Sequence, residues 1–132
     1  MSKTYYLFIS HAWDYSDHYE KIKQWLIEDE IKWQDYSVPV TNPIDATKKK
    51  ELKEKLTSRI KLSSAIIVVS AMYAAYSEWI DYEIDEAIRM NKVIIGVKPW
   101  GQEKVPVKIQ NCATAMVGWN KASVVKAIKD YA

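Results

Sequence analysis

A chain of 132 residues suffices for one domain with a core of ordinary size, so we expect 1–132 to be a single domain. Its 48% hydrophobic and 27% charged residues are the mixture of an ordinary globular protein. The formal net charge is only +2 and no apolar run could span a bilayer, which argues against nucleic-acid and membrane partners.

Cysteine, glycine and histidine usage narrows the class of protein further. Cys112 is the only cysteine, so no internal disulfide is possible, and without an export leader we expect a cytoplasmic protein. The glycines, Gly96, Gly101 and Gly118, form neither Gly-x-Gly-x-x-Gly nor Gly-x-x-x-x-Gly-Lys, which excludes both the dinucleotide fingerprint and the phosphate-binding P-loop. His11 and His18 are the only imidazoles and no ligand pattern surrounds them, so we expect no metal.

The first half of the chain is predicted to contain two strands and two helices. Residues 5–10 (YYLFIS) form a short aromatic and branched run, which predicts a buried strand. Ser16 is placed to cap a helix, residues 31–36 favour a second strand, and residues 38–47 have loop chemistry. The next helix has a narrow apolar stripe with a four-residue repeat, made of Leu52, Leu56 and Ile60. The basic stretch around it, 48–55, is interpreted as a solvated helix face with local ion pairs.

The second half continues the alternation of strands and helices. Residues 65–69 (AIIVV) are the clearest buried strand, followed by a helix over 77–90 and a strand over 93–97. The last predicted elements are a loop, a weaker strand and a closing helix at residues 99–106, 113–117 and 123–131. Continuous apolarity indicates strands buried on both faces, which are parallel. We therefore predict an α/β fold with a flavodoxin-like, doubly wound, five-stranded parallel sheet of order 2-1-3-4-5.

Ligands of such sheets bind beyond the carboxyl ends of the strands. The strand ends here lack the acidic residues of a phosphoacceptor receiver domain, since Ser10, His11 and Ser70 stand there instead. No serine lies in a nucleophile elbow, and Cys112 is interpreted as a lone core thiol. The helix over 77–90 is more informative.

That helix carries a tryptophan and a glutamate four residues apart, Trp79 and Glu83. Its buried face is predicted to consist of Ile80, Ile84, Ala87 and Ile88, and its solvated side of Glu78, Tyr82, Asp85 and Glu86. Trp79 and Glu83 then lie along one margin of the apolar face, where a carboxylate beside an indole can be partly desolvated and still reach a ligand. Spacing alone favours the plainer interpretation of a core-edge aromatic and an exposed helical glutamate.

Several segments resemble a known family. Residues 66–84 (IIVVSAMYAAYSEWIDYEI) resemble the third strand and following helix of TIR domains, in which a strand ends in Ser and Ser-x-Trp-x-x-x-Glu opens the helix. LFISHAWDYSDHYEKIKQWL and DYSVPVTNPI resemble a bacterial TIR-like branch that includes the Thoeris antiphage proteins. The resemblance covers essentially the whole chain in the same order of elements.

The resemblance implies that NAD⁺ is the substrate and that Glu83, at the position of the catalytic glutamate, is required to cleave the nicotinamide–ribose bond. Trp79 is then an aromatic wall for nicotinamide or adenine. Trp100 corresponds to an aromatic that borders the site in active relatives, or is an exposed loop tryptophan that covers the sheet end. Ser10 and His11 are candidates to bind phosphate or ribose, although His11 could equally hold its loop by hydrogen bonds.

Residues 38–45 take the place of the TIR BB loop but are rich in proline, where many animal and plant TIR domains have glycine. Asp35, Tyr36 and Asn42 are further substrate-binding candidates around it. In many relatives the complete site forms between subunits, so we expect a homo-oligomer on activation.

Three functions remain open at this stage. The first is an enzyme of the NAD⁺ nucleosidase or ADP-ribosyl cyclase type, which makes a cyclic or modified ADP-ribose signal for a separate effector protein in antiphage defence. The second is a non-enzymatic TIR-like adaptor that acts through homotypic protein–protein contacts. The third is a sensor that binds NAD⁺ or ADP-ribose without turnover.

Overall fold

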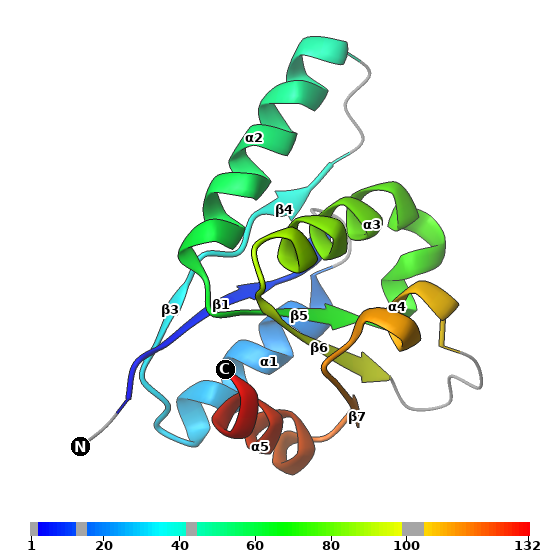
Figure 1. Ribbon diagram of the computed structural model, residues 1–132. Helices are drawn as coiled ribbons and strands as arrows, with labels where there is room; N and C mark the ends of the chain where they lie inside the picture. Colours follow the sequence, from blue (N-terminus) through cyan, green and yellow to red (C-terminus); the bar gives the residue numbers. More distant parts are fainter. Residues whose placement is uncertain (1–2, 13–15, 42–44, 99–104) are drawn as a thin grey trace.

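A five-stranded parallel sheet forms the centre of the computed structural model, which describes residues 3–12, 16–41, 45–98 and 105–132 (Figure 1). Its strands are β1 (Tyr5–Ile9), β3 (Trp33–Asp35), β5 (Ala65–Val69), β6 (Val93–Lys98) and β7 (Ala115–Gly118). They pair in the order β3-β1-β5-β6-β7. Counted along the chain this is the order 2-1-3-4-5, so the predicted flavodoxin-like topology is confirmed.

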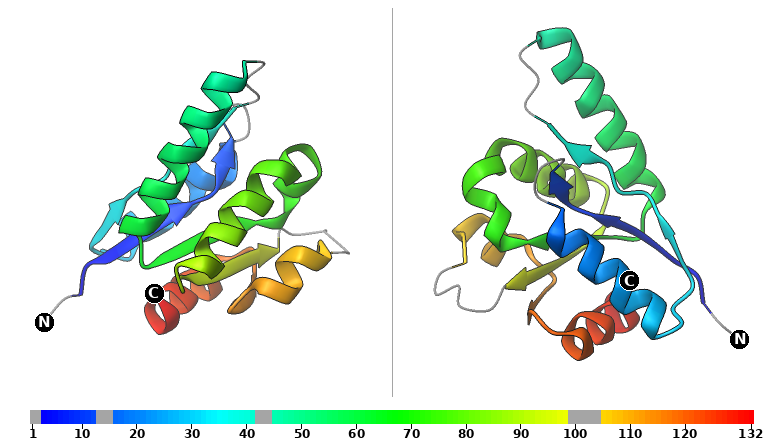
Figure 2. Two further views of the ribbon diagram at one scale, coloured as in Figure 1. Left: turned by 45° about the horizontal axis from the view of Figure 1, so that its top comes forward. Right: turned by 180° about the vertical axis from the view of Figure 1, so that it is seen from behind.

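Helices cover both faces of the sheet (Figures 1 and 2). One face packs against α2 (Ala46–Leu62), α3 (Tyr73–Arg89) and α4 (Val107–Cys112), and the other against α1 (Asp17–Glu28) and α5 (Lys121–Tyr131). A short 3₁₀ turn, η1 (Ser70–Met72), joins β5 to α3. Two apolar cores result, one on each side of the sheet.

The side chains of each strand alternate between these two cores. Leu7 and Ile9 of β1 point to the α1 and α5 side, whereas Phe8 points to the α2 and α3 side. In β5, Ile67 points to the α1 and α5 side and Ile66 to the α2 and α3 side. Because both faces are covered, apolar residues are favoured at every position of these strands, which explains their continuous apolarity.

Four short elements differ from the sequence prediction. The predicted loop over 38–47 contains β4 (Pro39–Val40), which pairs with β2 (His11–Ala12). Helix α4 was not predicted, and the last strand is Ala115–Gly118 rather than 113–117. These elements have two to six residues, too few for a periodic pattern to develop.

The position of α4 depends on a glycine in the neighbouring strand. A Cβ atom at Gly96 of β6 would lie 2.2 Å from Sδ of Met116 in β7 and 3.1 Å from Cγ2 of Ile109, the buried residue of α4. The missing side chain therefore leaves room for the Met116 side chain and for the close approach of this short helix to the sheet.

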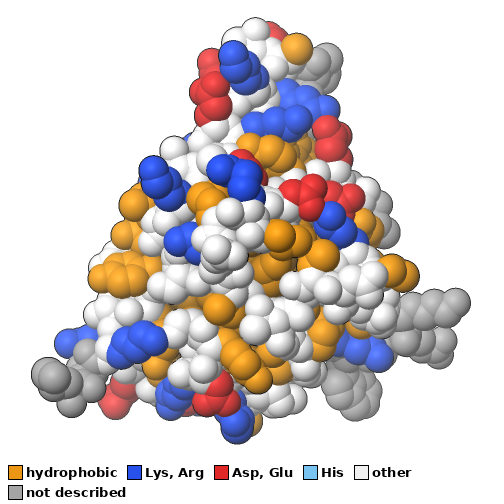
Figure 3. Space-filling view, viewed as in Figure 1, with side chains coloured by type: hydrophobic (Ala, Val, Ile, Leu, Met, Phe, Trp, Pro, Cys, Tyr) orange, Lys and Arg blue, Asp and Glu red, His pale blue; other side chains and the backbone are white. Residues whose placement is uncertain are grey.

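The first half of α2 extends beyond the sheet and carries the basic stretch (Figures 1 and 3). Its buried residues, Leu56 and Ile60, belong to the second half. Figure 3 shows acidic side chains among the basic ones here, and Lys49 forms an ion pair with Glu78 of α3. The solvated face is thus confirmed, whereas the ion pair of Lys49 reaches a neighbouring helix and is not local to the stretch. No helix in the described parts of the chain is long and apolar enough to cross a bilayer.

The central strand should dominate the stability of this fold. Ile67 is fully buried between the neighbouring strands, so Ile67→Ala should lower the free energy of unfolding by about 2–5 kcal/mol. Ile27→Ala on α1, where the side chain is 69% exposed, should change it by no more than about 0.5 kcal/mol. Urea titrations of both variants measure the difference, and equal losses would contradict the assigned core.

Candidate functional site

A serine and a glutamate from distant parts of the chain meet at the carboxyl edge of the sheet. Ser10 directly follows β1, and Glu83 lies in the middle of α3. The Ser10 hydroxyl donates a hydrogen bond of 2.5 Å to Oε1 of Glu83. Both side chains are buried, and Glu83 has no exposed surface at all. The carboxyl group therefore points toward the strand ends and not into solvent.

Glu83 is buried because it lies inside the apolar stripe of α3. The buried residues of the central part of this helix have a spacing of three and four and are Trp79, Ile80, Glu83, Ile84 and Ala87. The predicted face was displaced by about one position, since Ile88 is 49% exposed and Trp79 only 2%. The prediction that Trp79 and Glu83 lie at the margin of the face is therefore wrong, as is the alternative of an exposed glutamate.

The outer side of α3 also differs in part from the prediction. Glu78 and Asp85 are exposed, as expected. Tyr82 and Glu86 are half-buried against α2, where the Thr57 hydroxyl lies 2.6 Å from the Tyr82 hydroxyl and donates to Glu86 at 2.7 Å. The helix begins at Tyr73 rather than near Ser77, with a break in helical geometry at Tyr76.

Burial raises the pKa of Glu83 to about 8, and the hydrogen bond from Ser10 opposes this effect. Its second oxygen, Oε2, is buried and has no hydrogen-bond partner among the described residues. A carboxylate without a positive neighbour loses its hydration on burial, so the neutral acid is the favoured form at pH 7. Glu83 is the only buried acidic residue in the described part of the chain.

His11 begins β2 directly after Ser10, and its side chain contacts α1 instead of α3. Its ring stacks on Tyr19 with centroids 3.8 Å apart, and the Tyr19 hydroxyl donates to Asp35 at 2.5 Å. Nδ1 of His11 lies 3.0 Å from the carbonyl oxygen of Ile9 and must be the donor, because a carbonyl only accepts. Burial lowers the pKa of His11, which leaves Nε2 of the neutral ring as an acceptor.

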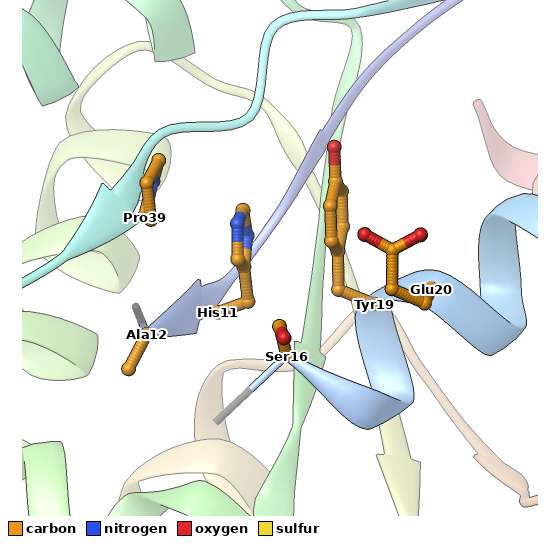
Figure 4. Close-up of a pocket in the computed structure, with 6 residues that line it drawn as sticks. All are labelled: His11, Ala12, Ser16, Tyr19, Glu20 and Pro39. Carbon is orange, nitrogen blue, oxygen red and sulfur yellow. The ribbon is translucent and has the colours of Figure 1, made fainter. Parts of the chain in front are cut away.

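A pocket of about 300 Å³ opens beside this ring pair (Figure 4). It is lined by His11, Ala12, Ser16, Tyr19, Glu20 and Pro39, which come from β2, α1 with its N-cap residue, and β4. Figure 4 shows the rings of His11 and Tyr19 side by side, with Glu20 next to Tyr19. The sequence gives no sign of the contact between Tyr19 and His11, because only the fold brings the two rings together.

The remaining predicted residues lie apart from Glu83 or outside the described residues. Asp35 accepts from Tyr19 and from the backbone N–H of Ser37, so it belongs to the His11 side. Tyr36 stacks on Tyr6 and under Arg59. Asn42 and Trp100 lie outside the described residues. The described residues contain no group of three side chains suited to hold a metal ion.

Comparisons with known proteins give one matching family and several similar solved structures. A family model described as the TIR-like domain of the Thoeris protein ThsB matches residues 8–104, whereas no curated protein matches the chain. A solved CMP N-glycosidase of Clostridium botulinum, BcmB, is similar with a TM-score of 0.57 and 12% identity, over 94% of this chain and 98% of that one.

Two further structures resemble the chain more distantly. A 3-dehydroquinate dehydratase-like protein from Bifidobacterium longum has a TM-score of 0.47 and 11% identity, over 99% of this chain and 95% of that one. A diflavin flavoprotein A3 from Nostoc sp. has a TM-score of 0.48 and 11% identity, over 92% and 81%. At such identities the structural likeness concerns the fold alone.

The raised pKa of Glu83 predicts a pH-dependent stability. The folded chain keeps this proton up to about pH 8, whereas an unfolded chain releases it near 4.5. The contribution of Glu83 to the free energy of unfolding should therefore be largest below pH 4.5, fall by up to about 1.4 kcal/mol per pH unit above it, and level off above pH 8. Glu83→Gln should flatten this slope between pH 5 and 8 in urea titrations.

Glu86→Gln is the matched control on the same helix. Arg89 holds the pKa of Glu86 near 2, so its titration contributes at acidic pH and not in this window. A slope that is the same in Glu83→Gln and the parent protein would show that Glu83 is ionised throughout.

Proposed function

The chain belongs to the family of Thoeris ThsB TIR-like domains, and on that premise we propose that it cleaves the nicotinamide–ribose bond of NAD⁺ with Glu83 as the catalytic carboxylate. The observation that carries this proposal is the isolated carboxyl group at the carboxyl edge of the sheet. Open α/β sheets bind their ligands at this edge.

The chemistry needs one carboxylate and no strong acid. When the bond between the ribose C1′ and the nicotinamide nitrogen breaks, both electrons pass to the nitrogen, and the cationic nicotinamide leaves as a neutral molecule. The ribose becomes oxocarbenium-like, as in glycoside hydrolysis. An ionised carboxylate near the ribose stabilises this developing charge more than it stabilises the ground state.

Capture of the cation completes the reaction. Water adds its oxygen to C1′ and releases a proton, which yields ADP-ribose. A hydroxyl or an adenine nitrogen of the same molecule yields a cyclic product instead. The proposal includes such a product as the signal for a separate effector protein in antiphage defence. The CMP N-glycosidase with a similar fold carries, by its name, a related bond-breaking activity on another nucleotide.

The charge of the substrate helps to ionise Glu83. Without a ligand, burial favours the neutral acid. A nicotinamide cation nearby lowers the pKa of a carboxyl group by direct attraction. The carboxyl group is fully covered in the structure, so the proposal requires the edge of the sheet to open when NAD⁺ enters. The aromatic role of Trp79 requires the same movement, because its ring is buried in the core.

Replacement of Glu83 should abolish the reaction. Glu83→Gln keeps the shape but removes the charge, so nicotinamide release from NAD⁺ should fall by about 100-fold or more. Chromatography of nicotinamide, with concentrated protein and with a crowding agent, measures this loss. Glu78→Gln, an exposed glutamate on the same helix, should retain full activity. If the parent protein releases no nicotinamide under any of these conditions, the adaptor function is favoured.

The activity should also depend on pH in a defined direction. Because the ionised form of Glu83 is needed, kcat/KM for NAD⁺ should rise as the pH increases from 6 and level off above about 8. Initial rates at low NAD⁺ concentration measure this profile. A decline over the same range would mean that the protonated acid is the active form.

A further inference from the structure

The two oxygens of the Glu83 carboxyl group have different surroundings. Oε1 accepts the hydrogen bond from Ser10, whereas Oε2 is buried without a partner among the described residues. Buried polar atoms almost always have a hydrogen-bond partner, because the loss of water is otherwise uncompensated. One oxygen is therefore occupied and the other is left unengaged.

Ser10 is held firmly in the position from which it donates. Its backbone N–H donates to the carbonyl oxygen of Ile67 at 2.8 Å, so it extends the pairing between β1 and β5. The preceding N–H, of Ile9, donates to the Ser37 hydroxyl at 2.8 Å. The sheet thus sets the direction of the Ser10 side chain independently of α3.

No other group competes for Glu83 in the described part of the chain, where burial and Ser10 alone account for its pKa. His11, the neighbouring titratable residue on the strand side, stacks on Tyr19. The ionisable side chains on and around α3 have other partners: Lys49 with Glu78, Lys53 with the Tyr82 ring, Lys108 with Asp85, Arg89 with Glu86, and Tyr73 with Asp81.

On the premise of the proposed NAD⁺ cleavage, we infer that Ser10 is the positioning residue of the reaction, which holds Oε1 so that Oε2 is the oxygen that faces the ribose. The hydroxyl restrains the rotation of the carboxyl group about its last bond. It also favours the ionised form, because a hydroxyl donates to a carboxylate more strongly than to a neutral acid. Ser10 does not itself touch the reacting atoms.

Removal of the hydroxyl should therefore affect turnover more than substrate binding. Ser10→Ala should lower kcat for nicotinamide release by about 10- to 100-fold and leave KM within about twofold. The rise of kcat/KM with pH should move to higher pH, because the pKa of Glu83 loses the contribution that lowers it. Ser10→Thr, which keeps a hydroxyl, should restore most of the rate.

Ser63→Ala is the matched control. Ser63 is a buried serine that precedes β5, at the end of the strand far from Glu83. Its hydroxyl donates to the carbonyl oxygen of Arg59, so the loss of this hydroxyl should leave the pH profile unchanged. If Ser10→Ala has the kcat and pH profile of the parent protein, Ser10 does not position Glu83.

A readout without turnover separates this inference from the proposed function. Carbon-13 NMR of protein labelled in the glutamate carboxyl groups, with the Glu83 signal assigned by its loss in Glu83→Gln, reports the pKa of Glu83 directly. Ser10→Ala should raise that pKa and Ser63→Ala should not. A raised pKa in a protein that never releases nicotinamide would overturn the proposed function, and with it a positioning role. An unchanged pKa in an active protein would overturn the role of Ser10 alone.

Discussion

A carboxyl group is buried at the edge of the sheet with one serine hydroxyl as its hydrogen-bond partner in the described structure. Burial disfavours its charge, and only the hydrogen bond from Ser10 opposes that effect. The result is an acid whose charge changes close to physiological pH, and groups with pKa values shifted in this way are common at functional sites. Stability alone would favour an apolar residue at position 83, because the rest of this face of α3 is apolar.

The end of β1 separates two environments. Ser10 and His11 are consecutive, yet Ser10 contacts α3 and His11 contacts α1. Ser10 meets Glu83 in the apolar layer under α3, and His11 meets Tyr19 beside the pocket next to α1. The two residues that the sequence analysis grouped as one binding element therefore belong to different sites.

The order of strands and helices could be predicted because long apolar runs occur only where both faces of a strand are covered. The family could be predicted from ordered motifs, and the match over residues 8–104 confirms it. The buried face of α3 was predicted with an error of about one position. A search for apolar residues includes Ile88 and leaves out Glu83, although the opposite is true in the folded chain. The helix is oriented so that Trp79 is buried and Ile88 is exposed, because the larger side chain of Trp79 removes more apolar surface from water.

The sequence by itself determined the topology, the family and the identity of the glutamate worth testing, since these depend on patterns within short segments. Only the tertiary structure decided how deeply Glu83 is buried, that Ser10 holds it, and that His11 faces elsewhere. The physical reason is that pKa values and hydrogen bonds depend on neighbours supplied by distant segments. Ser10 and Glu83 are 73 residues apart, and no local pattern records that the crossover from β1 to α3 brings them to 2.5 Å.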